Sequence, residues 1–179
     1  MTHFILPLSD PSATLDIAGG KGLSLTRLIQ AGLPVPGGFL ITTDAYRLFV
    51  AENGIQPRIL DALKNMDRTD PGSVEPIANQ IAGFFTGGTI PSELIQAISS
   101  ACEPWKDIPV AVRSSATAED LPEASFAGQQ DTYLNVRGIQ AILKAVQKCC
   151  ASLWTARAIA YRARQHIAPE EVALAVVVQ

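Results

Sequence analysis

Apolar residues recur every three or four positions through most of the first hundred residues, a pattern that predicts helices packing one face against a core. We expect a first helix after the glycines of 19–22, with Gly32 as its natural stop. The prolines and glycines of 34–38 exclude helix, so 39–41 is predicted to be extended. Residues 1–108 are therefore predicted to form a mixed, largely helical subdomain. Four further stretches carry the apolar positions of short helices: 45–49, 59–63, 74–85 and 94–98.

The pattern changes from helical to β-type after this part of the chain. The apolar run 109–112 predicts a short strand that ends at Arg113, and 131–136 alternates as a second strand would. Between them, 116–130 has no clear periodicity, and loops of this length are usually functional or disordered. A helical stripe follows and is expected to cover 139–164.

The chain continues into an uninterrupted apolar run from Val172 to Val178. A run without polar positions predicts a strand buried on both faces, as in the middle of a sheet. We expect its neighbouring strands to lie beyond Gln179. The predicted fold class is therefore α+β, with 109–179 as the start of a sheet and the domain incomplete at its C-terminus. Without those neighbours, the run would be an aggregation hazard.

Composition and charge exclude several classes of protein. Hydrophobic residues make up 47% of the chain, which excludes intrinsic disorder. The net charge of −3 gives no electrostatic footprint for nucleic acid or an anionic membrane. No stretch approaches the ~18 apolar residues that span a bilayer, and the start lacks the basic region of a secretory signal. Charged residues make up only 17%, which suggests a surface that further protein covers.

The cysteines and histidines predict neither a disulfide framework nor a metal site. The three cysteines form no CxxC pair, and neither of the two histidines has a partner at ligand spacing. A reducing cytoplasm is the expected setting. Among the acidic residues, Glu119, Asp120 and Glu123 are interpreted as a solvated acidic loop in preference to Mg²⁺ ligands or acid–base catalysts.

Two local patterns are candidates for phosphate binding. In Gly19-Gly20-Lys21-Gly22, glycines before a helix allow several backbone N–H groups to converge on an anion, and Lys21 adds a full charge. The alternative is an ordinary glycine turn with a solvated lysine. Arg113 stands at a predicted strand end before two serines, where its planar guanidinium can bind two phosphate oxygens. The alternative for Arg113 is an ion pair with Glu119 or Asp120.

Taken together, four segments resemble the N-terminal nucleotide-binding domain of the phosphoenolpyruvate synthase family, which pyruvate phosphate dikinase and rifampicin phosphotransferase share. The segments are 19–25, 32–39, 112–120 and 124–135. Residues 114–120, Ser-Ser-Ala-Thr-Ala-Glu-Asp, are similar to the synthase and rifampicin enzymes and less similar to the dikinase.

The resemblance implies an ATP-grasp-type domain that binds ATP between two subdomains. In such enzymes the phosphoryl group passes from ATP to a histidine on a separate swivelling domain, and then to pyruvate or to the antibiotic. By this resemblance Lys21 and Arg113 contact the phosphates, and Gln179 begins the hinge region that meets adenine. Residues of the loop and the following strand would line the nucleotide site: Gly128, Thr132 and Tyr133. The Mg²⁺ ligands, the histidine and the acceptor domain are expected beyond Gln179, so no catalytic residue is assigned here.

The resulting hypothesis is an ATP-binding portion of a phosphotransferase acting on pyruvate, with the 179-residue chain alone inactive. Two alternatives stay open: the corresponding portion of a rifampicin phosphotransferase, and a non-catalytic nucleotide-binding or partner-binding module.

Overall fold

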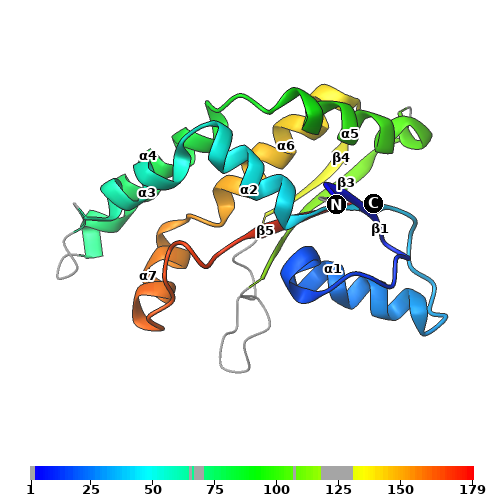
Figure 1. Cartoon of the computed structure of the whole chain (residues 1–179), viewed down its shortest axis with the longest axis horizontal. Coiled ribbons are helices and arrows are strands. Elements are labelled where there is room, and N and C mark those ends of the chain that lie inside the picture. Colours follow the sequence, from blue (N-terminus) through cyan, green and yellow to red (C-terminus); the bar gives the residue numbers. More distant parts are fainter. Residues whose placement is uncertain (1–2, 65, 67–70, 107, 118–130) are drawn as a thin grey trace.

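The computed structural model describes residues 3–64, 66, 71–106, 108–117 and 131–179. At the centre of this part of the chain lies an antiparallel sheet with the strand order β1-β2-β5-β3-β4 (Figure 1). Its strands are β1 (Ile5–Pro7), β2 (Phe39–Ile41), β3 (Val110–Ala116), β4 (Thr132–Val136) and β5 (Leu174–Val178). Helices accompany the sheet, so the expected α+β class is confirmed.

Helices cover both faces of the sheet, but unequally. Figure 1 shows α1 on one face and the group from α2 to α6 on the other. A large core fills the space between the sheet and this group, and a smaller core lies under α1. The helices are α1 (Leu15–Gln30), α2 (Thr43–Glu52), α3 (Ile55–Lys64), α4 (Val74–Thr86), α5 (Ser92–Cys102), α6 (Ile139–Ser152) and α7 (Ala156–Arg164), with 3-10 turns η1 (Pro71–Ser73) and η2 (Glu103–Trp105).

β5 is the central strand, and all five of its residues are buried. Val176 and Val178 face the large core, whereas Val177 faces the smaller core under α1. The prediction of a strand buried on both faces is confirmed. The expectation that its neighbours lie beyond Gln179 is wrong, because β2 and β3 pair with its two edges. This pairing removes the basis for treating β5 as an aggregation hazard.

β3 is longer than predicted. The strand does not end at Arg113 but continues to Ala116, and its last three residues pair with β5. Polar residues are tolerated there because their hydroxyls have partners: Ser115 bonds to α1, and Ser114 Oγ donates to the Asp131 carbonyl at 3.4 Å. Buried hydroxyls with partners avoid the cost of desolvation.

The single helix expected over 139–164 is two helices. α6 ends at Ser152, and α7 begins after Thr155, whose side chain accepts a hydrogen bond from the Ala158 N–H at 3.3 Å. This N-cap starts a new helix, because its side chain satisfies an N–H group that the first turn leaves without a partner. Most of the predicted functional loop, 118–130, lies outside the described residues.

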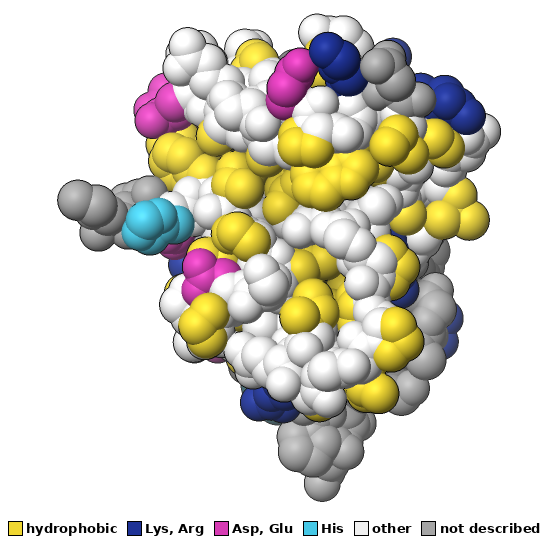
Figure 2. Space-filling model, turned by 90° about the vertical axis from the view of Figure 1, so that its right-hand side faces the viewer, with side chains coloured by type: hydrophobic (Ala, Val, Ile, Leu, Met, Phe, Trp, Pro, Cys, Tyr) yellow, Lys and Arg dark blue, Asp and Glu magenta, His cyan; other side chains and the backbone are white. Residues whose placement is uncertain are grey.

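Hydrophobic side chains also reach the surface. Figure 2 shows them gathered in a band across the side of the molecule that lies to the right in Figure 1. Over the whole described surface, the most exposed large hydrophobic residues are Leu33, Ile108 and Leu134. Within the same residues, no helix combines the length and apolar character needed to cross a bilayer.

The sheet joins both parts of the chain that the sequence separates at residues 108 and 109. β1 and β2 come from the first part, and β3, β4 and β5 come from the second. The division into two subdomains remains a prediction.

Candidate functional site

The Gly-Lys turn lies inside α1, where this helix packs against β3. Gly19 has a φ of 66° and a ψ of 176°, which interrupts the helical geometry near the start of α1. Only glycine adopts this conformation readily. A Cβ at Gly19 would also overlap the carbonyl oxygen of Ser115. The backbones of α1 and β3 therefore approach each other as closely as they do because residue 19 is a glycine.

Ser115 ties α1 to β3. Its Oγ donates to the Ala18 carbonyl at 2.8 Å and accepts from the Gly22 N–H at 3.0 Å, and both bonds are buried. The sequence predicted that several N–H groups of this turn would bind one anion together. The Gly22 N–H is not available for that purpose, because Ser115 already accepts it.

Lys21 extends from the same turn toward β3. Its Nζ donates to the Ser114 carbonyl at 3.1 Å, and this bond is partly buried. The ammonium group is therefore held beside the backbone that follows Arg113. The geometry brings two cationic residues, predicted from separate motifs 19–25 and 112–120, to one place in the fold.

Arg113 contacts the residue that follows β5. Its Nη1 donates to Gln179 Oε1 at 3.3 Å. Gln179 is itself held by the backbone, because its N–H and carbonyl bond to Ala111 at 3.0 and 2.7 Å. The Gln179 amide is neutral, and no carboxylate among the described residues forms an ion pair with Arg113. The alternative partners, Glu119 and Asp120, lie outside that part of the chain.

Strand register separates the other predicted site residues. Arg113 stands directly opposite Thr132 and Val177, so Thr132 shares its face of the sheet, the face under α1. Tyr133 stands opposite Val112, a member of the large core on the other face. Lys21, Arg113, Thr132 and Gln179 are thus brought together, whereas Tyr133 points away from them. Gly128 lies outside the described residues.

Tyr133 lines a cleft of about 370 Å³ on the opposite face. Its hydroxyl donates to Asp131 Oδ2 at 2.7 Å, and the Lys148 ammonium lies 5.5 Å from the centre of its ring. Burial, followed by the hydrogen bond from Tyr133 to Asp131, raises the pKa of this phenol. Sequence reasoning missed Asp131 and Lys148 as members of a site. Alternation along β4 could have separated Tyr133 from Thr132, but the approach of Lys148 depends on how α6 packs.

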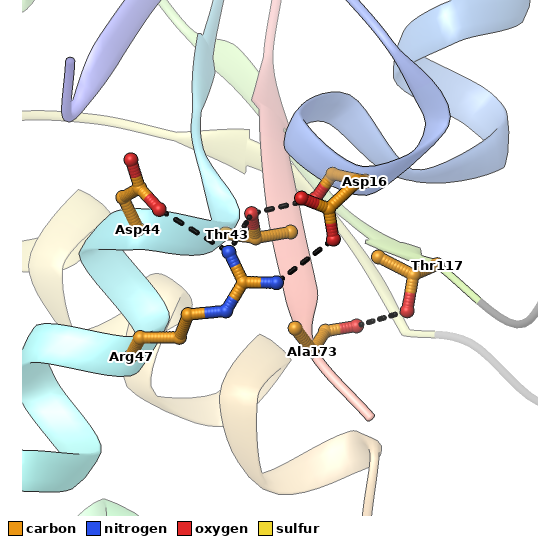
Figure 3. A network of polar contacts seen from close by, with 6 residues as sticks. All are labelled: Asp16, Thr43, Asp44, Arg47, Thr117 and Ala173. Atoms are coloured by element: carbon orange, nitrogen blue, oxygen red, sulfur yellow. Dashed lines mark hydrogen bonds and ion pairs between the residues drawn. The ribbon is translucent and has the colours of Figure 1, made fainter. Parts of the chain in front are cut away.

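A polar network between α2 and the first turn of α1 holds that turn in place (Figure 3). The guanidinium of Arg47 bonds to Asp16 at 2.8 Å and to Asp44 at 3.2 Å, while the Thr43 hydroxyl donates to the Asp16 carbonyl at 2.6 Å. Exposed ion pairs of this kind stabilise little. Their effect here is on position, because they connect α2 to the turn of α1 that leads into Gly19.

No group of three His, Cys, Asp or Glu side chains in the described ranges could hold a metal ion. All three cysteines are buried free thiols, and burial raises the pKa of each. The three acidic residues considered as Mg²⁺ ligands, Glu119, Asp120 and Glu123, lie outside those ranges.

Comparisons with known proteins identify the family. The chain is 48% identical over 171 residues to the probable phosphoenolpyruvate synthase of Methanocaldococcus jannaschii, covering 92% of this chain and 14% of that protein. It is 46% identical over 170 residues to the phosphoenolpyruvate synthase of Deinococcus radiodurans, covering 92% and 22%. The rifampicin phosphotransferase of Bacillus subtilis is 41% identical over 182 residues, covering 100% and 21%.

The chain thus spans about a fifth of the length of these curated relatives. Residues 15–179 match the family described as pyruvate phosphate dikinase, AMP/ATP-binding domain. The matched range contains Lys21, Arg113, Thr132 and Gln179. The resemblance found in the four sequence motifs is confirmed, and the chain belongs to the pyruvate phosphate dikinase AMP/ATP-binding domain family.

Proposed function

We propose that the chain is the ATP-binding portion of a phosphotransferase that moves a phosphoryl group from ATP, by way of a phosphohistidine, to pyruvate. The family and the relatives named phosphoenolpyruvate synthase support the proposal. The observation that carries it is the convergence of Lys21 and Arg113 at β3. The proposed fold type is ATP-grasp, and the proposed setting is the cytoplasm.

In this proposal the two cations share the charge of the ATP phosphates. The Arg113 guanidinium can bind two oxygens with fixed geometry, whereas Lys21 supplies a compact charge. Such positioning and charge compensation provide most of the catalysis in phosphoryl transfer. Thr132 lies on the same face and offers a hydroxyl, and Gln179 begins the segment proposed to meet adenine. Gly128 remains a predicted lining residue of the nucleotide site.

Tyr133 was expected to line the nucleotide site, but its register places it on the other face of the sheet from Arg113, so we propose a different role for it. Its proposed contribution is to fix β4 beside Arg113 through the bond to Asp131. Mg²⁺ is proposed to come with ATP and to neutralise phosphate charge. The described residues offer no cluster that fits it. Following the family resemblance, we propose that its ligands belong to the part of the relatives that this chain does not cover.

ATP binding can be tested on the 179-residue chain by a ¹H–¹⁵N chemical-shift titration, which detects weak complexes. Arg113→Lys keeps the charge but loses the planar guanidinium, so we expect ATP affinity to fall about tenfold or more. Arg164→Lys is the matched control, since Arg164 lies on the exposed surface of α7. Equal ATP affinity in the Arg113→Lys variant and the wild type would contradict the phosphate role.

Rifampicin phosphotransferase is the second candidate, because a relative with that name matches the whole chain. A protein that contains this chain, supplied with ATP and either pyruvate or rifampicin, would distinguish the two by which acceptor is phosphorylated. The 179-residue chain alone is expected to give no acid-labile phosphoprotein with radiolabelled ATP and Mg²⁺. Labelling of His166 in that assay would contradict this expectation.

A further inference from the structure

Arg162 on α7 is a buried cation. Only 4% of the residue is exposed, although arginines are almost never fully buried without a partner. Its Nη2 has no hydrogen-bond partner, and none of the described carboxylates forms an ion pair with it. The guanidinium lies over the Trp154 ring, 4.7 Å from its centre. Burial lowers the pKa of Arg162 to about 10, so the group remains charged at neutral pH.

A cavity of about 110 Å³ adjoins this guanidinium. Apart from Arg162 and Trp154, the described residues of its wall are apolar: Leu63, Met66, Ile159, Ala163, Ile167 and Pro169. The Trp154 N–H is already committed, since it donates to the Tyr46 hydroxyl at 3.1 Å. Arg162 is therefore the only strong hydrogen-bond donor among the described side chains of this wall.

These features indicate what kind of molecule could bind in the cavity beside Arg162. A buried water needs two to four polar partners, which an apolar wall does not provide. A carboxylate can instead accept from the planar guanidinium and compensate its charge. An apolar cavity of about 150 Å³ holds benzene, with six heavy atoms, so 110 Å³ admits about four or five by proportion. A short carboxylate with an apolar tail meets both requirements.

We propose that Arg162 and the adjoining cavity form a binding site for a small monocarboxylate. The carboxylate lies against the guanidinium, and its short hydrocarbon tail lies against Ile159, Ile167 and their apolar neighbours. The site is separate from the proposed phosphate site, because neither Lys21 nor Arg113 is among the described residues that line the cavity. It does not depend on the proposed function.

The two tryptophans of the chain, Trp105 and Trp154, provide the readout. In a Trp105→Phe background the emission comes from Trp154, which stacks on Arg162. We expect a saturable change in this emission with sodium propionate at constant ionic strength. Propionamide has the same size without the charge and should bind about tenfold more weakly or less. Octanoate exceeds the cavity and should also bind more weakly.

Arg162→Lys should weaken propionate binding, because lysine keeps the charge and loses the planar guanidinium. Should this variant fail to fold, the propionate and propionamide titrations of the parent chain still decide the matter. The proposal is overturned if propionate gives no change in emission, or a change that does not saturate. It is overturned as well if a carboxylate of the chain itself already occupies the cavity and so prevents the response. An equal response to propionamide overturns it as well, since the cavity would then recognise only apolar shape.

Discussion

At the scale of single residues, Ser115 shows how one hydroxyl can position a candidate binding site. It is fully buried, and its Oγ contacts the backbone of α1 on both sides of Lys21. A Cβ at Gly19 would lie 2.5 Å from the Ser115 Oγ, so the hydroxyl fits beneath α1 because residue 19 is a glycine. The position of Lys21 over β3 thus depends on a neighbouring serine whose hydroxyl bonds to the backbone of α1.

Replacing Ser115 with Ala should reduce the free energy of unfolding by about 2 kcal/mol, because the Gly22 N–H and the Ala18 carbonyl lose a buried partner. Urea unfolding followed by circular dichroism measures this loss. Ser100→Ala, at an exposed position on α5, is the control and should change stability by less than about 0.5 kcal/mol. Equal stability of the two variants would show that water replaces the Ser115 hydroxyl.

The residues of the candidate site were predictable to different degrees. Lys21 and Arg113 were found from their motifs, because glycine turns and arginines beside serines are local signals. The motifs did not predict that Lys21 and Arg113 would lie close together, because this depends on how α1 packs against β3. The sequence left a solvated lysine open as the alternative for Lys21, and it gave no sign of the hydrogen bond from the Lys21 ammonium to the Ser114 carbonyl. Contacts between segments this far apart in the sequence come from packing, which a local pattern does not contain.

At the scale of elements, the contact between α1 and β3 depends on Gly19. Gly19→Ala should destabilise the chain by about 4 kcal/mol, as a sum of strained backbone and overlap with β3. Gly32 is the matched control, because its φ of 75° is also positive but a Cβ there meets nothing within 4 Å. Gly32→Ala should therefore cost only about 1–2 kcal/mol. Thermal melts of both variants separate steric overlap from backbone strain, and equal losses would contradict the close approach.

The edge of the sheet at β4 should govern self-association. Among the described strands, β4 pairs only with β3, and Leu134 on β4 is 73% exposed. Edge strands with apolar side chains can pair with a second copy. At concentrations where the wild-type chain forms larger species, Leu134→Lys should sediment as a monomer, whereas the control Leu28→Lys on α1 should not differ from wild type. Association that persists in the Leu134→Lys variant would exclude the β4 edge as the contact.

Periodicity predicted most helices, the extended segment at β2 and the buried character of β5. It did not predict the break between α6 and α7, because the apolar stripe continues through the buried Trp154 while Thr155 caps a new helix. It also predicted that β3 ends at Arg113, whereas the strand continues to Ala116. Ser114 and Ser115 look like a turn in the sequence, and only their partners on α1 and next to β4 explain why they remain in a strand.

At the scale of the whole molecule, the buried thiols make stability depend on alkaline pH. Burial raises the pKa of Cys150 to about 12 and also raises that of Cys149. The native state therefore keeps these protons at pH values where the unfolded state loses them. The thiols leave stability unaffected below about pH 8, because an ordinary thiol with a pKa of about 8.5 is then protonated in both states, and they lower it as the pH rises from there toward 12.

Between pH 7.5 and 9.5, each of these thiols should lower the free energy of unfolding by about 1 kcal/mol. Urea melts at the two values under reducing conditions measure the loss. Cys150→Ala removes one titrating group, so its loss should be smaller than that of the wild type by about the same amount. An unchanged pH dependence in Cys150→Ala would show that other groups cause it.

The central place of β5 has a consequence for the order in which the fold can form. β5 follows the other described strands in the sequence, yet β2 and β3 meet only through it. A chain that leaves the ribosome from its N-terminus can form the backbone hydrogen bonds of its early helices at once, because those bonds are local. The sheet has to wait until residues 174–178 have been synthesised. Until then, β2 and β3 each present an open edge, so the period just before β5 emerges is when the growing chain most needs protection by chaperones.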